Sequence, residues 1–426
     1  MSARRQILQL SLFALCASSW LAAHRAEANL NLTILHSFAP GTADGSYPSS
    51  SLVLSGSQLY GTTYEGGAFN GGTAFRINTD GTGHTLLHSF AGNVLNDGQN
   101  PRGTMVLVGD ALFGTTASFD GTLFRVNTDG TGYSVLHWFP LPSIPADGTG
   151  PQGSLALSGT TLYGTTIGGG ASDLGTAYHI ETDGTGFALM HQFAGGAGDG
   201  AMPYINGPTR DGSTLYGMTP AGGVFDRGTI YSINTDGTGF GLVHSFTSFV
   251  GAANIPEQNE LTVVGSTLYG MTNDGGVFSQ GAIFRVNTDG SNFQILHSFN
   301  YAGTFTDGQS PAGILTLRDS TLYGMTELGG AANLGTIFQI NTDGTGYEVA
   351  HSFTGGASDG AVPVAGSLTL SGSTLYGLAS LGGAHNRGVV FTVTVPEPAT
   401  VVLATIGMAA LWVAARKRRR AGCPRC

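Results

Sequence analysis

Lysine and cysteine are almost absent from this 426-residue chain. Its one lysine is Lys417 and its three cysteines are Cys16, Cys423 and Cys426, so residues 29–395 contain neither type. A body without cysteine gains nothing from disulfide bonds and must be stabilised by buried apolar surface. The same segment has eight arginines against twenty-five acidic residues, a formal charge of −17. This acidic composition argues against a nucleic-acid partner, because such binding depends on neutralising phosphates.

Familiar catalytic motifs are scarce as well. The chain has no His-Glu-x-x-His pair, and the absence of lysine from the body excludes a Walker-type phosphate loop there. Paired acids of the kind used by glycoside-active enzymes need no local motif, so they stay an alternative. We therefore expect a protein that is not an enzyme.

Both ends of the chain carry long apolar runs. Residues 1–28 combine Arg4 and Arg5 with an apolar stretch and end in Ala26-Glu27-Ala28, which is typical of a secretory signal peptide. The other end has an uncharged run over 399–415 followed by a basic cluster over 416–420. As a helix rising about 1.5 Å per residue, this run would just cross a bilayer core, with the basic cluster left in the cytoplasm. We expect an exported body anchored in the membrane through its C-terminus.

The segment 396–426 begins with Pro396, Glu397 and Pro398. This order of motif, apolar run and basic cluster resembles the PEP-CTERM sorting signal of Gram-negative bacteria, although Cys423 and Cys426 depart from its usual ending. The resemblance implies an exosortase-type enzyme as a partner, recognition of these three residues, and a final location at the cell surface or outside the cell. A plain C-terminal anchor is the alternative, and it also places the body outside the cytoplasm.

The segment 29–395 is a tandem repeat. The pattern Leu-aromatic-Gly recurs seven times at intervals of 50 to 54 residues, at Tyr60, Phe113, Tyr163, Tyr216, Tyr269, Tyr323 and Tyr376. A histidine followed two residues later by phenylalanine also recurs seven times, at His36, His88, His137, His191, His244, His297 and His351. A period near 50 is typical of kelch-like arrays, in which each repeat forms one four-stranded blade.

Each repeat predicts four short strands separated by glycine and aspartate. In the repeat around Tyr323 we expect strands at 314–317, 321–326, 336–341 and 347–353. The body starts on a fourth strand, at 33–38, and ends on a third strand, at 388–394. One strand and three strands make a whole blade, so pairing of the two ends would close the ring and protect its edges. The predicted fold is an all-β, seven-bladed β-propeller of four-stranded blades, with one C-terminal transmembrane helix.

The copies read Leu-Tyr-Gly-Thr-Thr, Gly-Gly, Gly-Thr-Phe and Leu-His-Ser-Phe, and from residue 35 to residue 391 they resemble the GloVer tandem-repeat family. Its members include bacterial exported proteins, some with PEP-CTERM tails. The resemblance implies no established catalytic activity. Two stretches depart from the pattern: 115–122 lacks the Gly-Gly pair, and 251–256 lacks Asp-Gly.

Two sets of loops should emerge on the same face of the ring. One joins strands two and three and carries the Gly-Gly pair; the other crosses to the next blade and carries Asp-Gly-x-x-Pro. The aspartates of the crossings are candidate binding residues, able to hold Ca²⁺ or sugar hydroxyls: Asp44, Asp97, Asp147, Asp199, Asp307 and Asp359. The alternative, which we favour, is that Asp-Gly builds the turn and proline stiffens it.

The seven repeated histidines would lie too far apart to share a metal ion, so we expect no metal site and interpret them as hydrogen-bonded structural residues. Features that break the repeat are better pointers to a site. They are the crossing 138–146, the insertion 249–259, and the side chains of Glu257, Glu260, His84, His179, Asp173, Arg227 and His385.

These patterns favour a non-catalytic cell-surface or matrix protein that presents one loop face to a polysaccharide or protein partner. The alternative is a secreted carbohydrate-active propeller enzyme, either a lyase or a hydrolase. A single cleft lined by unrepeated acids would favour the enzyme, and near sevenfold equivalence would favour the binding protein.

Overall fold

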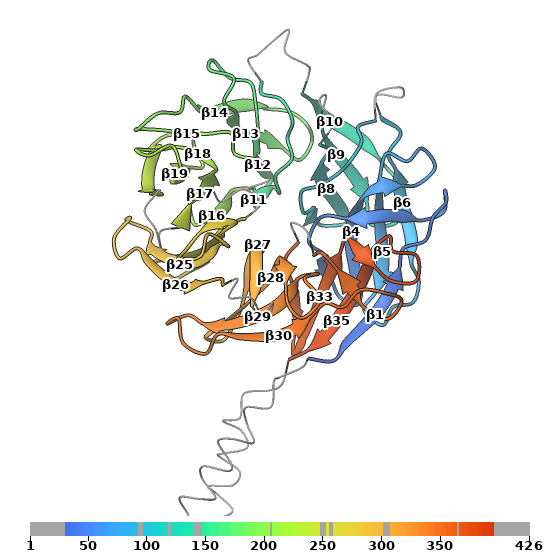
Figure 1. Ribbon diagram of the computed structural model, residues 1–426. Helices are drawn as coiled ribbons and strands as arrows, with labels where there is room; N and C mark the ends of the chain where they lie inside the picture. The colour runs from blue at the N-terminus through green and yellow to red at the C-terminus, as the bar shows by residue number, and fades with distance from the viewer. Residues whose placement is uncertain are drawn as a thin grey trace, which may run out of the picture.

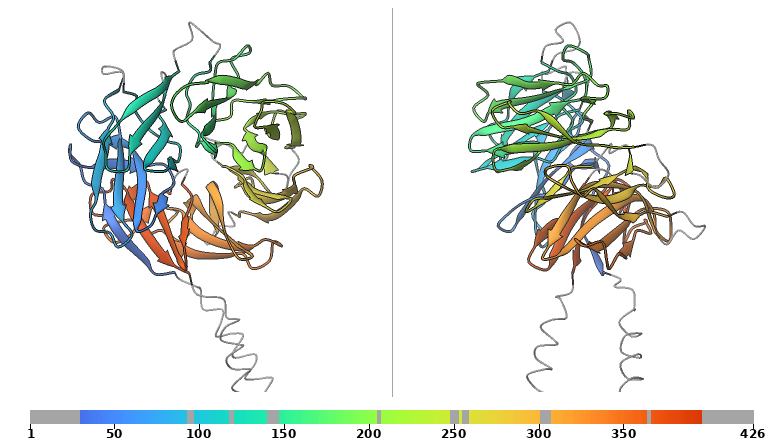
Figure 2. Two further views of the ribbon diagram at one scale, coloured as in Figure 1. Left: turned by 180° about the vertical axis from the view of Figure 1, so that it is seen from behind. Right: turned by 90° about the vertical axis from the view of Figure 1, so that its left-hand side faces the viewer.

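The computed structural model describes residues 30–395, apart from 93–96, 118–120, 140–146, 205–206, 248–252, 255–258, 301–306 and 364–365. The described residues form β-strands and turns, with no α-helix among them. Seven antiparallel blades of four strands follow one another around a ring, and in blade 1 the crossing adds a fifth strand to the sheet. Figure 1 shows the ring, and Figure 2 shows it from behind and from the side. The predicted seven-bladed β-propeller is confirmed.

The strands of blades 1 to 4 are β3 (Val53–Ser55), β4 (Gln58–Gly66), β5 (Thr73–Asn78) and β6 (Thr85–Ser89); β7 (Val106–Val108), β8 (Ala111–Thr115), β9 (Thr122–Asn127) and β10 (Ser134–Trp138); β11 (Ala156–Ser158), β12 (Thr161–Thr166), β13 (Thr176–Glu181) and β14 (Ala188–Gln192); and β16 (Thr209–Asp211), β17 (Thr214–Thr219), β19 (Thr229–Asn234) and β20 (Gly241–Ser245).

The strands of blades 5 to 7 are β22 (Thr262–Val264), β23 (Thr267–Thr272), β25 (Ala282–Asn287) and β26 (Gln294–Ser298); β27 (Gly308–Arg318), β28 (Thr321–Gly329), β29 (Thr336–Asn341) and β30 (Glu348–Ser352); and β32 (Thr369–Ser371), β33 (Thr374–Ala379), β35 (Val389–Thr394) and β1 (Leu32–Ser37). The crossings form short ribbons with the Gly-Gly loops, through β2 (Gly45–Pro48) with β4, β15 (Gly200–Ala201) with β18 (Ala221–Gly222), β21 (Ala253–Asn254) with β24 (Asp274–Gly275), and β31 (Gly360–Ala361) with β34 (Leu381–Gly382).

Blade 7 closes the ring with one N-terminal and three C-terminal strands, as the sequence predicts. Strand β1 pairs antiparallel with β35, with Ile34 opposite Phe391. The amide of Leu30 also donates a 2.9 Å hydrogen bond to the carbonyl of Ala350 in blade 6. This pairing covers the edge that β35 would otherwise expose, and β1 becomes the outer strand of the blade.

The core consists of apolar clusters between successive blades. Tyr60 of blade 1, for example, packs with Met105, Leu112 and Phe124 of blade 2. The glycine after each repeated aromatic is part of this packing: a Cβ on Gly61 would lie 2.7 Å from the ring of Phe75, which faces it across the strand pair. The pattern Leu-aromatic-Gly thus provides an inter-blade contact through its aromatic ring. Its glycine leaves the space that the aromatic ring of the next strand occupies.

No helix in the described part of the chain is long and apolar enough to cross a membrane. The expected signal peptide over 1–28, the motif Pro396, Glu397 and Pro398, the span over 399–415 and the basic cluster all lie outside the described residues.

Candidate functional site

Each crossing aspartate contacts the repeated histidine that precedes it. Six such pairs form, with the histidine Nε2 and the nearest carboxylate oxygen 2.9 to 3.7 Å apart: His36–Asp44, His88–Asp97, His137–Asp147, His191–Asp199, His297–Asp307 and His351–Asp359. His244 is the exception, because its crossing has no aspartate. Each pair ties the outer strand of one blade to the crossing that starts the next.

The aspartates also organise the crossing backbone. The carboxylate of Asp359 accepts hydrogen bonds from the amides of Thr354 and Gly360 as well as from the histidine. Burial favours a higher pKa for Asp359, but the hydrogen bonds from His351 and Thr354 outweigh it and hold the pKa below its ordinary value. This carboxylate is ionised and already occupied by protein donors.

The six aspartates belong to six separate seams between blades and are not gathered at one point. Within the described residues, no group of three potential metal ligands contains two of them. Their proposed contact with Ca²⁺ or sugar hydroxyls therefore stays a prediction, and the turn-building role is the one whose hydrogen bonds are visible.

The repeated histidines share a second contact. Each packs edge-on against the phenylalanine two residues later, and six of them stack face to face on a ring from the next blade. The stacked rings lie 3.5 to 3.9 Å apart and belong to His84, Tyr133, Phe187, Phe240, Phe293 and Tyr347. The histidines are hydrogen-bonded or stacked structural residues, as the sequence suggests.

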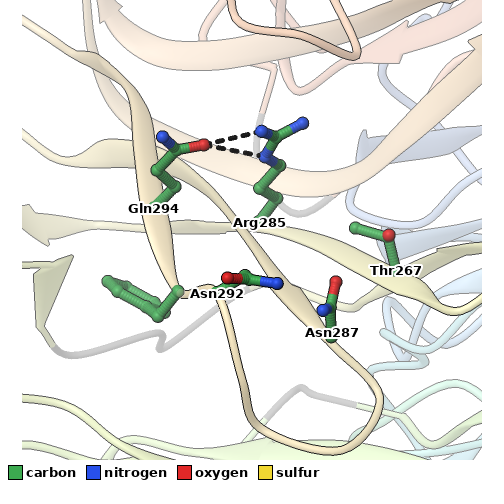
Figure 3. Close-up of a pocket in the computed structure, with 6 residues that line it drawn as sticks. Thr267, Arg285, Asn287, Asn292 and Gln294 are labelled. Atoms are coloured by element: carbon green, nitrogen blue, oxygen red, sulfur yellow. Dashed lines mark hydrogen bonds between the residues drawn. The ribbon is translucent and has the colours of Figure 1, made fainter.

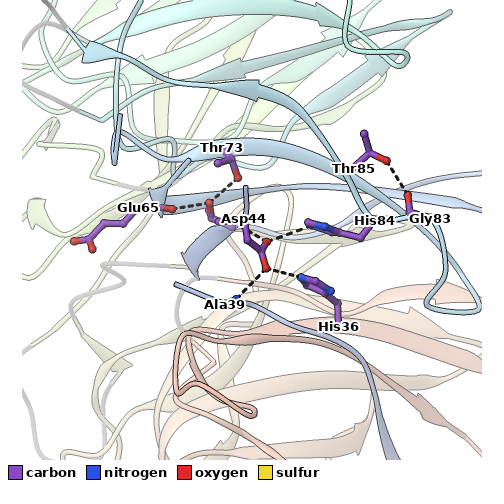
Figure 4. Close-up of polar contacts among 10 residues, drawn as sticks. His36, Ala39, Asp44, Glu65, Thr73, Gly83, His84 and Thr85 are labelled. Atoms are coloured by element: carbon purple, nitrogen blue, oxygen red, sulfur yellow. Dashed lines mark hydrogen bonds and ion pairs between the residues drawn. The ribbon is translucent and has the colours of Figure 1, made fainter. Parts of the chain in front are cut away.

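One seam departs from this pattern, between blades 7 and 1. The stacked ring there is itself a histidine, His84, which lies just before β6. Its Nε2 is 3.7 Å from Oδ1 of Asp44, while His36 Nε2 is 3.0 Å from Oδ2 of the same carboxylate. Figure 4 shows the two imidazoles on the same side of Asp44.

The side chains of this histidine pair and their aspartate are 13 to 21% exposed. The Nε2 atom of His84 is buried and has no hydrogen-bond partner. Burial, together with the neighbouring His36, lowers the pKa of His84 to about 4 although Asp44 opposes the shift. At neutral pH His84 is uncharged, with one ring nitrogen able to accept a proton or a metal ion.

A second irregular group surrounds Glu260, which precedes the inner strand β22 of blade 5. Glu260 accepts a 3.3 Å hydrogen bond from the amide of Gly207, and its own amide donates to the carbonyl of Gly313. Burial raises the pKa of Glu260 to about 7, against the opposing hydrogen bonds from Ser154 and Gly207. Glu257, its neighbour in the insertion, lies outside the described residues.

The Gly-Gly loops and the crossings do share one face, as predicted. The amide of Gly223 donates to the carbonyl of Asp199, and Gly67, Gly330 and Gly383 repeat this contact in their blades. Three of the loops expose a phenylalanine at the same position, with exposed fractions of 59% for Phe69, 44% for Phe225 and 48% for Phe278. We call this surface the loop face.

Beside Phe225 the loop face is hollowed by a cavity of about 750 Å³. Leu174, Met202, Val224 and Phe225 line it, and all of these except Leu174 are exposed apolar residues. A smaller, polar hollow of about 370 Å³ lies at the other end of blade 5, where Arg285 donates two hydrogen bonds to Gln294 (Figure 3). The hollow on the loop face is thus lined by apolar side chains, whereas the hollow at the opposite end is lined mainly by polar ones.

The remaining irregular residues separate into two kinds. Asp173 is structural, because its carboxylate accepts a 2.7 Å hydrogen bond from the amide of Gly169. The backbone of Asp173 has a positive φ of 56°, as a tight turn requires. His179 is a strand residue beside Tyr163, and its Nδ1 is buried without a hydrogen-bond partner. Arg227 and His385 are exposed on Gly-Gly loops and belong to the loop face. Most of the crossing 138–146 lies outside the described residues.

One short motif matches a hydrolase pattern without its geometry. Residues 356–360 read Gly-Ala-Ser-Asp-Gly, but Ser358 is exposed in a turn that leads into β31. A nucleophile elbow needs a strand before the serine and a helix after it. The following Asp359 is bound to His351 instead. This motif therefore builds a crossing.

Together these features define a closed β-propeller with histidine–aspartate pairs at six seams and an apolar loop face. Sequence profiles of the Gloeobacter/Verrucomicrobia repeat match residues 24–203, 117–273 and 256–409. The chain belongs to this repeat family, which confirms the GloVer resemblance. No curated protein matches its sequence.

Solved structures resemble this chain at low sequence identity. An oligogalacturonate lyase in complex with manganese is 15% identical, with a TM-score of 0.54 over 88% of this chain and 95% of the other. A puromycin-hydrolysing peptidase of Mycobacterium tuberculosis is 14% identical over 83% of this chain and 50% of the other, with a TM-score of 0.47. A chain of the nidogen/laminin complex is 14% identical, with a TM-score of 0.42 over 69% of this chain and 92% of the other. At 15% identity the likeness to the lyase shows the fold alone.

Proposed function

We propose that this propeller is an exported, non-catalytic protein of the cell surface or extracellular matrix, which binds a polysaccharide or protein partner through its loop face. The observation that carries the proposal is the repeated exposure of Phe69, Phe225 and Phe278 at one position of the Gly-Gly loops. Exposed apolar surface on a soluble domain marks interaction sites, and aromatic rings supply large contact areas at little entropic cost.

Of the two partner classes, a neutral polysaccharide fits better. The formal charge of −17 on the body disfavours acidic glycans, and repeated aromatic side chains suit a polymer that presents the same apolar sugar face many times. Phe225 and Phe278 stand on neighbouring blades, so one extended chain could contact both. Export and sorting through Pro396, Glu397 and Pro398 rest on the sequence patterns of the two ends.

The test is a glycan array probed with the full-length protein and with a Phe69→Ala, Phe225→Ala, Phe278→Ala variant. Alanine is a fair replacement because Ala332 occupies this loop position in blade 6. We expect retention of a neutral glycan by the natural protein and at least a tenfold weaker affinity in the variant, with the same melting temperature. Leu328→Ala, which removes an apolar residue elsewhere on the loop face, is the matched control.

Equal binding by the variant would show that the loop aromatics are not the site. Binding to no glycan, with binding to a surface protein that the variant loses, would select the protein partner. Cleaved products in the same incubation would contradict a non-catalytic role.

A second candidate function is a carbohydrate-active enzyme, and one observation favours it. Glu260 contacts Gly207 and Gly313 of two other blades, and its pKa is raised to about 7, a value suited to general acid–base catalysis. Product formation that disappears in Glu260→Gln, while glycan binding persists, would select this alternative.

A further inference from the structure

The seam between blades 7 and 1 holds three metal-ligating groups, whereas five other seams hold a histidine and an aspartate and the seam of His244 holds the histidine alone. Four residues before each repeated histidine, the position contains Tyr133, Phe187, Phe240, Phe293 or Tyr347 in five copies, Leu32 in another and His84 in the remaining one. A phenylalanine there only stacks on the histidine of the preceding blade, whereas the hydroxyls of Tyr133 and Tyr347 also donate hydrogen bonds to Asp97 and Asp307. His84 keeps the stack, with ring centroids 3.9 Å apart, and adds a ring nitrogen next to Asp44.

The three side chains lie within range of one ion. His36, Asp44 and His84 each offer one ligand atom, and these atoms all lie within 4.8 Å of one another. They are the one such group of three or more histidine, cysteine, aspartate or glutamate residues in the described ranges. Two imidazole nitrogens and one carboxylate oxygen form the donor set of many zinc sites, and they suit related divalent ions such as cobalt.

The protein gives the Nε2 of His84 nothing else to bind. This atom is buried and has no hydrogen-bond partner, which is costly for a polar group. The carboxylate of Asp44 is ionised and keeps its oxygen Oδ1 directed at both His84 and the amide of Gly45.

We propose that His36, Asp44 and His84 bind one divalent transition-metal ion of the zinc class. The sequence expectation of no metal considered only the seven repeated histidines, and His84 is not among them. The two imidazoles are nearly parallel, at 11°, so binding requires the His84 ring to turn out of the stack toward Asp44. Three protein ligands leave a fourth, tetrahedral position for water.

Such an ion would fasten the closing strand of the ring. His36 belongs to β1, which is held in blade 7 by pairing with β35, whereas His84 leads into the outer strand of blade 1. A metal between them cross-links the two blades at the side chains and raises stability by mass action, since the unfolded chain brings no such group together. The site is independent of the loop-face aromatics.

The test is a titration of the full-length protein, stripped of metal, with Co²⁺ and then Zn²⁺. Cys16, Cys423 and Cys426 are first replaced by serine, so that thiolates cannot compete. We expect one equivalent of Co²⁺ with the visible bands of a tetrahedral ion, displacement by Zn²⁺, and a higher melting temperature with metal than with chelator. His84→Phe should bind no metal and still fold, because Phe187, Phe240 and Phe293 fill the same position in other seams.

A gain-of-site variant provides the opposite control. In the parent protein, Phe240 stacks on His191, and His191 Nε2 lies 3.1 Å from Asp199. Phe240→His therefore places a second imidazole beside Asp199 and should raise the number of metal ions bound per protein to two. The proposal is overturned if the natural site takes up no metal, if His84→Phe binds as well as the parent, or if Phe240→His gains no second equivalent.

Discussion

The side-chain hydroxyls of Ser51 and Ser367 lie 2.5 Å apart although 316 residues separate them. The Ser51 hydroxyl oxygen also accepts a hydrogen bond from the amide of Ser367, and the hydroxyl of Thr369 donates to the carbonyl of Leu52. These contacts join blade 1 to blade 7 at their inner strands. Together with the β1–β35 pairing, they close the ring at its inner and outer edges.

Closure predicts a large penalty for disrupting β1. Ile34 packs against the blade 6–7 cluster opposite Phe391, so Ile34→Asp should lower the free energy of unfolding by about 3 kcal/mol through burial of an unpaired charge. The measurement is urea unfolding followed by circular dichroism. Thr33→Asp, on the exposed side of the same strand, is the control. Equal, small effects at both positions would contradict a closed ring.

The contacts of the crossing aspartates predict that two carboxylates near one blade contribute unequally to stability. Asp359→Ala leaves His351 and the amides of Thr354 and Gly360 without their acceptor and should cost about 3 kcal/mol. Asp343→Ala, in the exposed hairpin turn, removes a bond to Thr345 that water can replace and should cost much less. Thermal unfolding of both variants decides. If the two melting temperatures fall equally, the crossing aspartates have no special structural role.

The low pKa of His244 predicts that the protein loses stability in acid. Burial lowers its folded pKa to about 4 from an ordinary value of 6.5, so the folded state binds fewer protons than the unfolded state over that interval. Its contribution to stability is complete above pH 6.5 and is lost as the pH falls toward 4.

The His244→Phe variant should therefore lose less stability between pH 7 and pH 5 than the parent, by about 1–2 kcal/mol. Phenylalanine can keep the stack on Phe293. Denaturant midpoints at several pH values provide the measurement, with the exposed His385→Phe as control for loss of any histidine. Parallel pH profiles for parent and His244→Phe would refute the prediction.

The raised pKa of Glu260 predicts the opposite effect, a loss of stability as the pH rises. Burial raises its folded pKa from 4.5 to about 7, so its stabilising effect is complete below pH 4.5 and is lost as the pH rises through 7. Glu260→Gln should be more stable than the parent by about 3 kcal/mol at pH 8 and nearly equal to it at pH 4. Melting temperatures at both pH values test this, and a variant less stable at pH 8 would show that the charge is satisfied.

Much of this architecture is visible in the residues. The seven copies of Leu-aromatic-Gly and His-x-Phe predict the blades, and the split of one strand plus three predicts β1 beside β35, because strand periodicity and turn chemistry are local properties. In blade 6 the predicted strands 321–326, 336–341 and 347–353 coincide closely with β28, β29 and β30. Even the unusual His84 stands out, since aromatic rings fill its position in five other copies.

Side-chain partners across the seams were decided only by the tertiary structure. The sequence presents Asp44 as a turn residue, and only the docking of blade 7 on blade 1 places it against both His36 and His84. The same holds for Glu260, whose pKa depends on burial and on hydrogen bonds from Ser154 and Gly207 of two other blades. Repeat patterns are written along the chain, whereas burial and distance between blades arise from how the ring closes, and these set the chemistry of each site.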